Sequence, residues 1–124
     1  MNFEVDKKDN YALVKVKVEK LDSHVSPGLK SELVVLNADE FKNLIVDLTD
    51  TRYCDSSGLS AILVANRLCK NSNGTFILTG LQRSVSKLIS ISQLDTILNI
   101  TPTIEEAVDF LTMEEVERDL GKGE

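Results

Sequence analysis

The run Leu44-Ile45-Val46-Asp47-Leu48 constrains the fold more than any other part of this sequence. Four apolar residues with one polar member among them are typical of a strand that is buried on both faces, as in parallel sheets covered by helices. Parallel strands need long crossover connections, because a tight hairpin reverses the chain direction. The run therefore predicts an α/β domain with helices between its strands.

The segments around this strand alternate as such a fold requires. Upstream, apolar residues alternate with Lys15 and Lys17 between Tyr11 and Val18, which predicts a strand with one solvated face. Residues 2–5 form a shorter candidate strand, and the polar residues that separate the two favour a hairpin. Two further apolar runs predict later strands, at residues 75–78 and 97–100.

Capping residues and apolar spacing predict four helices. The first begins at Ser26-Pro27, where the serine is a candidate cap and the proline fits the first turn, and it ends at 37–39. Its predicted buried face consists of Leu29, Leu33 and Leu36. The next two helices are predicted at 57–70 and 82–92. The last follows Thr101-Pro102 with the capping pattern Thr103-x-x-Glu106. We expect the domain to span residues 1–112 and the charged residues 113–124 to form a frayed tail.

Length, charge and cysteine content set further limits. With 124 residues, of which 42% are hydrophobic, the chain can bury one core of ordinary size. Its formal charge of −6 disfavours direct binding to nucleic acid or to an anionic membrane. No apolar stretch approaches the roughly 18 residues that span a bilayer, and no secretory leader is recognisable, so we expect a soluble, cytoplasmic protein.

The metal and redox chemistry open to the chain is narrow. Cys54 and Cys69 are too few for a disulfide scaffold, and we expect both to be reduced core residues. The chain contains one histidine, whereas a structural zinc site needs about four clustered ligands. We therefore expect neither a metal site nor a cofactor.

The segment from Thr51 to Leu59 is the most informative for function, because ligand sites of α/β folds lie beyond the carboxyl ends of the strands. Ser56 and Ser57 stand at the start of a predicted helix, where a serine can cap free N–H groups. A phosphate attached there would meet unpaired donors and the positive end of the helix dipole. The segment thus indicates either a helix cap formed by Asp55, Ser56 and Ser57 or a phosphoacceptor serine, and the residues by themselves favour the cap.

Enzymatic alternatives fit this sequence poorly. A serine hydrolase needs a G-x-S-x-G turn and a later histidine, whereas residues 54–58 lack the first glycine and His24 precedes the serines. A receiver domain has Asp47 or Asp50 as candidate acceptor, but no acidic pair follows the first strand. No Gly-rich nucleotide-binding motif occurs. We therefore expect a binding protein rather than an enzyme.

The stretch Tyr53-Cys54-Asp55-Ser56-Ser57-Gly58-Leu59, together with the strand before it and the helix after it, resembles the signature region of STAS domains, specifically of bacterial anti-sigma factor antagonists. Leu21-Asp22 and the segment from Gln93 to Ala107 also match, so the resemblance covers most of the chain. It implies a single STAS-like α/β domain with a mostly parallel sheet of four to five strands and about four helices.

The resemblance also implies a function. Ser56 would be phosphorylated by a cognate anti-sigma factor that has serine kinase activity and dephosphorylated by a PP2C-type phosphatase. The unmodified domain would bind the anti-sigma factor, phosphorylation would release it, and transcription would be regulated in this way. The implied partner-binding residues are Asp22, Ser23, Asp55, Ser56, Ser57 and Gly58.

Three questions stay open at this point. Asp55 either orients the Ser56 hydroxyl or caps the loop backbone. Gly58 either permits close approach of a partner or relieves crowding. The alternative function within the resemblance is a STAS scaffold or regulatory subunit that serves a non-sigma signalling partner or a transporter.

Overall fold

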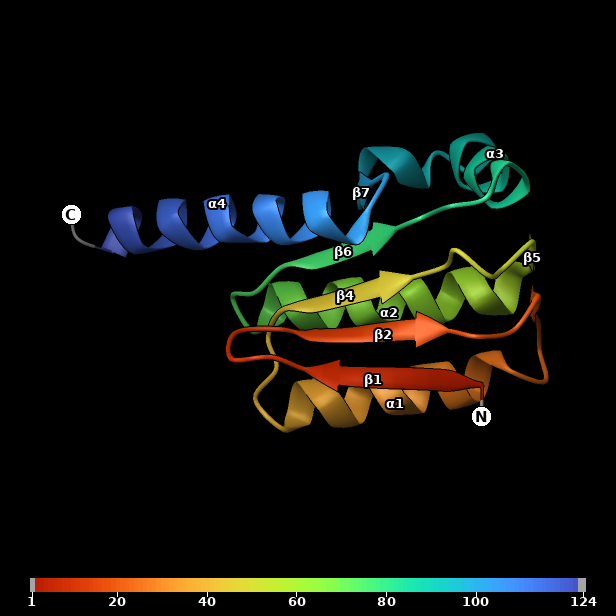
Figure 1. Cartoon of the computed structure of the whole chain (residues 1–124), viewed down its shortest axis with the longest axis horizontal. Helices are drawn as coiled ribbons and strands as arrows, with labels where there is room; N and C mark the ends of the chain where they lie inside the picture. Colours follow the sequence, from red (N-terminus) through yellow and green to blue (C-terminus); the bar gives the residue numbers. More distant parts are fainter. Residues whose placement is uncertain (1, 123–124) are drawn as a thin grey trace.

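The computed structural model describes residues 2–122 and contains a five-stranded sheet with the order β1-β2-β4-β6-β7 (Figure 1). β1 (Phe3–Lys7) pairs antiparallel with β2 (Ala12–Val16). β4 (Leu44–Asp47), β6 (Phe76–Thr79) and β7 (Asn99–Thr101) continue the sheet parallel to β2. The predicted hairpin and the predicted mostly parallel sheet are both confirmed.

β4 occupies the centre of the sheet, as its sequence predicts. It is flanked by β2 and β6, and all four of its residues are buried. Because both neighbours are parallel to it, the carboxyl ends of β2, β4 and β6 meet at one edge of the sheet. The loops that follow these strands are thereby brought to the same end of the molecule.

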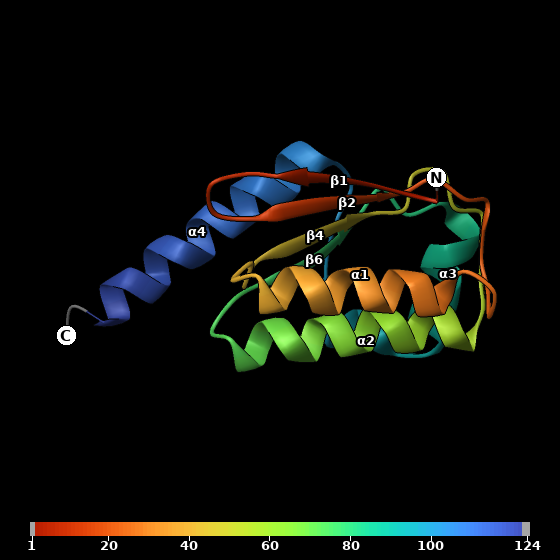
Figure 2. The same cartoon turned by 90° about the horizontal axis from the view of Figure 1, so that it is seen from below.

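Helices cover the two faces of the sheet unequally. α1 (Ser26–Ala38) and α2 (Ser56–Asn71) lie side by side on one face, over the larger core, whereas α4 (Ile104–Lys122) begins on the other face (Figure 2). α3 (Arg83–Ile91) and a short 3-10 turn at Leu94–Thr96 connect β6 to β7. Within residues 2–122, none of the helices has the length and apolar character needed to cross a membrane.

The first helix is confirmed, but its predicted cap is wrong. Its leucines Leu29, Leu33 and Leu36 are buried as expected. Ser26, however, is the first helical residue and is itself buried, so its hydroxyl does not cap the helix. The carbonyl of Asp22 instead accepts the N–H groups of Val25 and Ser26.

The last helix is longer than the sequence indicates. Thr103 Oγ1 accepts the N–H of Glu106 at 3.2 Å, which confirms the predicted capping pattern. The helix then continues to Lys122, so the expectation of a frayed tail from Met113 onward is wrong for residues 113–122. Residues 123 and 124, which that expectation also included, lie outside the described residues.

A second sheet of two short strands was not anticipated. β3 (Lys20–Leu21) and β5 (Tyr53–Cys54) pair in parallel beyond the carboxyl ends of the main strands. Each has only two residues, which is too short to show a period of two in the sequence. This pair places the loop that contains the candidate serines.

Candidate functional site

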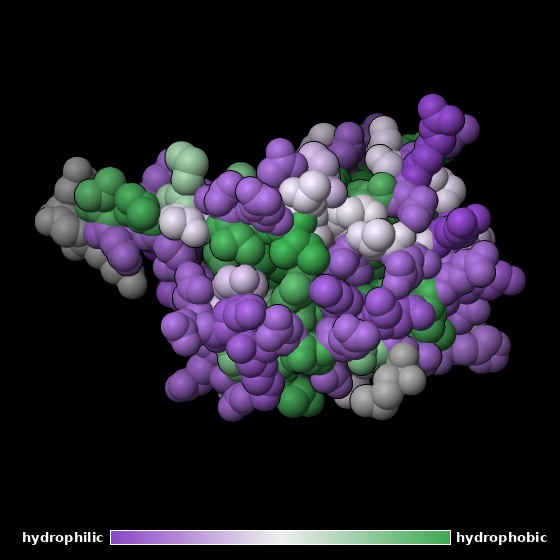
Figure 3. All heavy atoms as spheres, viewed as in Figure 1, coloured by the Kyte–Doolittle hydropathy of each residue, from purple (hydrophilic) through white to green (hydrophobic). Residues whose placement is uncertain are grey.

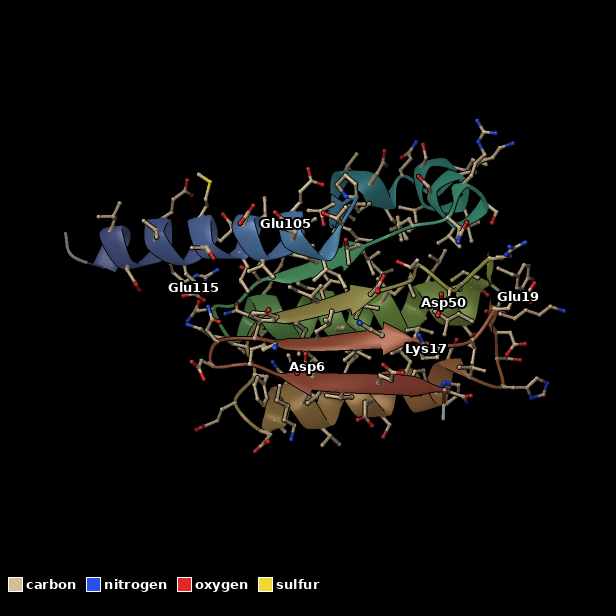
Figure 4. All side chains as sticks on the ribbon, in the orientation of Figure 1. Asp6, Lys17, Glu19, Asp50, Glu105 and Glu115 are labelled. Atoms are coloured by element: carbon tan, nitrogen blue, oxygen red, sulfur yellow. The ribbon has the colours of Figure 1, made fainter. Side chains whose placement is uncertain are left out.

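The loop between β4 and β5 is anchored to the end of β2. Thr51 is fully buried, and its hydroxyl donates to the carbonyl of Val18 at 2.9 Å. Lys17 Nζ lies 3.0 Å from the Asp50 carboxylate, and Figure 4 shows the two side chains near this end of the sheet. Asp47, the other candidate acceptor of a receiver domain, accepts both the N–H and the hydroxyl of Thr49. Both aspartates therefore have structural partners.

The pairing of β3 with β5 brings together two loops that are distant in the sequence. Leu21 is in register with Cys54, and its carbonyl also accepts the N–H of Asp55 at 3.3 Å. The residues that follow the two strands consequently lie next to each other. The structure thus places Asp22 and Ser23 beside the predicted phosphoacceptor loop, as the resemblance implied.

Asp55 caps α2. One of its carboxylate oxygens, Oδ1, accepts the backbone N–H of Ser57 at 2.9 Å, that of Gly58 at 3.2 Å and the hydroxyl of Ser57 at 2.5 Å. Of the two roles left open for Asp55, these contacts support the cap. Of the three candidate caps Asp55, Ser56 and Ser57, the structure gives the role to Asp55.

The hydrogen bonds to the Asp55 carboxylate also lower its pKa. The Ser57 hydroxyl is the main cause of a lowered pKa, because its hydrogen bond stabilises the carboxylate. Partial desolvation acts in the opposite direction, and the N–H groups of Gly58, Ser57 and Ser23 add to the lowering. Because Ser23 follows β3, its N–H group connects the loop after β3 to the capping carboxylate of Asp55.

The two serines have different environments. Ser57 is half-buried, and its hydroxyl contacts both Asp55 and the Ser26 hydroxyl of α1, which lies 3.2 Å away. Ser56 is exposed, and its hydroxyl has no hydrogen-bond partner among residues 2–122. Of these two serines, Ser56 is therefore the one that presents a free hydroxyl to a second molecule.

Gly58 is explained by packing within the domain. It is buried, and a Cβ atom added to it would lie 2.5 Å from Cys54 Sγ and 2.9 Å from the carbonyl oxygen of Leu21. Real Cβ atoms do not approach neighbours so closely. Of the two roles left open for Gly58, these distances support relief of crowding, because the glycine lets α2 pack against β3 and β5.

Both cysteines are free and buried, as expected. Burial raises the pKa of the Cys54 thiol to about 11 and that of Cys69 to about 12, because desolvation disfavours the thiolate. Cys54 lies directly before the cap, but its thiol faces the interior. Within the described part of the chain, no group of three or more His, Cys, Asp or Glu side chains is placed to hold a metal ion.

A cluster of basic side chains at this end of the molecule could not be found from the sequence. Arg52, Arg83 and Lys87 line a shallow hollow of about 540 Å³, and the hydroxyl of Ser84 on α3 donates to the carbonyl of Arg52. The next residue, Tyr53, is 52% exposed. The cations come from segments more than thirty residues apart in an acidic chain, so only the packing of α3 against β5 reveals the cluster.

Comparison with known proteins agrees with this architecture. The family model of the STAS domain matches residues 2–107. The chain belongs to the STAS-domain family. The STAS domain here is also 30% identical over 109 residues to the anti-sigma-B factor antagonist of Bacillus subtilis, covering 87% of this chain and 99% of that protein.

Solved STAS structures share the fold. The anti-sigma factor antagonist from Mycobacterium paratuberculosis superimposes with a TM-score of 0.80 at 21% identity, over 89% of this chain and 92% of that one. The unphosphorylated form of the antagonist SpoIIAA gives 0.77 at 20% identity, over 89% of this chain and 96% of its own. These likenesses confirm the predicted α/β class and its mostly parallel sheet.

Proposed function

We propose that this STAS domain is an anti-sigma factor antagonist controlled by phosphorylation of Ser56. Relatives from Bacillus subtilis and Listeria monocytogenes carry the name anti-sigma-B factor antagonist, and a phosphorylated form is known for SpoIIAA. The observation that carries the proposal is the contrast between the two serines. Ser56 is exposed and unpaired within residues 2–122, whereas the Ser57 hydroxyl is held by Asp55 and Ser26.

The proposed partner of the unmodified domain is an anti-sigma factor with serine kinase activity. It docks over Ser56, the adjacent loop at Asp22 and Ser23, and the start of α2. Tyr53 precedes this loop in β5 and is 52% exposed, so we include its ring in the proposed contact surface. Docking displaces the sigma factor from the anti-sigma factor, and a PP2C-type phosphatase later regenerates the unmodified serine.

Phosphorylation acts in this proposal through charge. A phosphate adds about −1.5 to −2 charges beside Asp55 and close to the loop that contains Asp22. Desolvating such a group in a packed interface, or leaving one buried charge unpaired, costs on the order of 2 to 5 kcal/mol. Because each 1.4 kcal/mol is about tenfold in affinity, the lower value already weakens binding roughly thirtyfold.

The first test is peptide mass spectrometry of the protein recovered from its native cells. We expect phosphate on Ser56 in the wild type and none on Ser57. Ser57→Ala, the matched control, keeps the modification, whereas Ser56→Ala loses it. Phosphate on Ser57 instead would contradict the assignment of the acceptor.

The second test compares the forms in binding. The unmodified chain is expected to capture an anti-sigma factor with a kinase domain, and Ser56→Asp is expected to bind it at least about thirtyfold more weakly. If Ser56 stays unmodified in every growth condition and Ser56→Asp still holds the partner, the switch is wrong. A constitutive STAS scaffold or regulatory subunit for a non-sigma signalling or transporter partner then becomes the better interpretation.

A further inference from the structure

α4 consists of two parts with different surroundings. In the first part, Ile104, Ala107, Val108 and Leu111 pack against Leu13, Ile45 and Ile77 on the sheet face that α1 and α2 leave open. Beyond Leu111 the helix projects past the edge of the sheet, at the end of the molecule opposite β5 (Figures 1 and 2). This distal part, residues 112–122, lies far from the phosphoacceptor loop.

A polar network fixes the rotation of the distal part. Glu115 Oε1 accepts Asn43 Nδ2 at 2.7 Å and Arg118 Nη1 at 2.8 Å, and Arg118 Nη2 donates to Thr75 Oγ1 at 2.8 Å. Asn43 is itself buried and also bonds the carbonyl of Asn10 and the N–H of Thr75. Figure 4 shows Glu115 on the side of α4 that faces the strands. The helix therefore turns polar side chains toward its own domain.

The opposite side of α4 is apolar and exposed. The outer stripe consists of Phe110, Met113, Val116 and Leu120, which are between 36% and 68% exposed. At about 100° per residue these four positions fall within a sector of about 120°, centred opposite the residues that contact the sheet. Figure 3 shows hydrophobic surface at the far end of α4.

In the distal part of α4 the polar side faces the domain and the apolar side faces solvent, whereas a helix that packs only within its own domain has the opposite orientation. Helices in proteins gain most of their stability from burying an apolar face, and an apolar row turned to solvent contributes nothing to that. An exposed apolar row of this kind is typical of a surface that is covered in a complex.

The charge of the residues around the outer stripe indicates which kind of molecule would cover the stripe. Four acidic residues share this side of α4 within the described helix, and no basic residue does: Glu105, Glu106, Asp109 and Glu117. A second copy would oppose acids to acids, and an anionic membrane would be repelled in the same way. A partner surface with an apolar centre and a rim of Lys or Arg would match both the apolar stripe and the acidic residues beside it.

We propose that the outer stripe is the docking site for a basic amphipathic helix of a partner protein. The apolar face of that helix covers Met113, Val116 and Leu120, and its cations pair with the flanking carboxylates. This surface is separate from Ser56, so a molecule bound to the phosphoacceptor loop leaves it free. The proposal does not depend on the function assigned to Ser56.

The test uses the full chain and defined probes. A synthetic amphipathic peptide of Leu and Lys is titrated into the isotope-labelled protein and followed by amide NMR, with a Leu and Glu peptide of the same pattern as the control. We expect shifts concentrated at residues 105–120 and an affinity that falls at least about tenfold between 50 and 500 mM salt. Met113→Glu is expected to weaken binding at least tenfold, whereas Val35→Glu, on the exposed side of α1, leaves it unchanged.

Other outcomes overturn the proposal. Shifts spread over other acidic regions, or equal binding of the Leu and Glu peptide, would show that α4 has no special affinity for a basic helix. Sedimentation that shows a dimer of the wild type, abolished by Met113→Glu, would assign the stripe to a second copy instead. Because Met113 is 66% exposed, its substitution is not expected to unfold the domain, and circular dichroism checks this.

Discussion

Gly58→Ala tests whether packing inside the domain requires this glycine. The added methyl would lie 2.5 Å from Cys54 Sγ, 2.9 Å from the carbonyl oxygen of Leu21 and 3.0 Å from Leu21 Cγ. The carbonyl cannot withdraw easily, because it belongs to the β3–β5 pair and accepts the N–H of Asp55. We therefore expect the methyl to destabilise the free protein.

Gly28→Ala is the matched control. Gly28 is the third helical residue of α1, as Gly58 is of α2, but a Cβ atom there would lie 3.4 Å from Phe3 Cε2, which is ordinary contact. Both variants gain the same helix propensity, roughly 0.5–1 kcal/mol relative to glycine. The difference between their free energies of unfolding therefore measures the cost of crowding at Gly58, for which we expect about 1–3 kcal/mol.

Urea unfolding followed by circular dichroism measures this difference, since the chain has no tryptophan to report by fluorescence. With an m-value of about 1–3 kcal/mol/M, Gly58→Ala should unfold at a urea concentration roughly 1 M below Gly28→Ala. Adding Cys54→Ala removes the nearest atom and should restore part of the loss, seen as a coupling of about 0.5–3 kcal/mol. Equal stability of the two glycine variants would refute the packing argument and leave the glycine for a partner.

Three further expectations follow from the site and its supports. Because the pKa of Asp55 is lowered in the folded chain, its contribution to stability is present above the ordinary carboxyl value of about 3.9 and is lost as the pH falls below it; Asp55→Asn should remove this part of the acid dependence in pH-resolved unfolding. Cys54 and Cys69 should react with a thiol reagent at pH 8 only after unfolding, because both are buried with raised pKa values. Gly80→Ala should cost at least about 1–2 kcal/mol in urea unfolding, since Gly80 has φ of +72° and a Cβ atom there would meet Asp47 Oδ1 at 2.7 Å.

The main sheet was predictable because its strands have a strong local signal. β4 is a nearly continuous apolar run, which indicates burial on both faces, and the alternation in β2 indicates a strand. The expectation that β2 has one solvated face is wrong, because four of its five residues are buried and α4 covers Leu13. α2 lies where the sequence predicts a helix, but burial along it does not follow the size of the apolar side chains. Ala61 and Ala65 are buried on α2, whereas Leu63 and Leu68, which are larger, stay partly exposed. Close packing of α1 on α2 favours small residues at the contact, and hydrophobicity alone does not show where that contact lies.

The errors fall where a partner distant in the sequence decides the structure. Residues beyond Met113 have the composition of a solvated tail, yet Glu115 is held by Asn43, which lies 72 residues earlier. Arg118 is held by Thr75 across 43 residues. Without these two contacts the charged sequence offers no reason for the helix to continue to Lys122.

For the site, the sequence identified the loop but not the division of roles within it. The residues alone favoured a helix cap formed by Asp55, Ser56 or Ser57, and only the resemblance singled out Ser56. The coordinates give the cap to Asp55 and bind the Ser57 hydroxyl to it. Which of three adjacent polar side chains accepts the helix N–H groups depends on backbone angles, and a pattern of residue types does not fix these.

The capping by Asp55 has a consequence for a phosphate on Ser56. The N-terminus of a helix ordinarily attracts a phosphate, because its free N–H groups and its dipole stabilise negative charge. In α2 the N–H groups of Ser57 and Gly58 are already bonded to the Asp55 carboxylate, so the donors that would neutralise a phosphate are taken. A phosphate on Ser56 therefore either competes with Asp55 for these donors or stays directed at solvent with most of its charge uncompensated. The second arrangement leaves the cap intact and presents the full charge to an approaching partner, which suits a serine that changes binding without changing the fold.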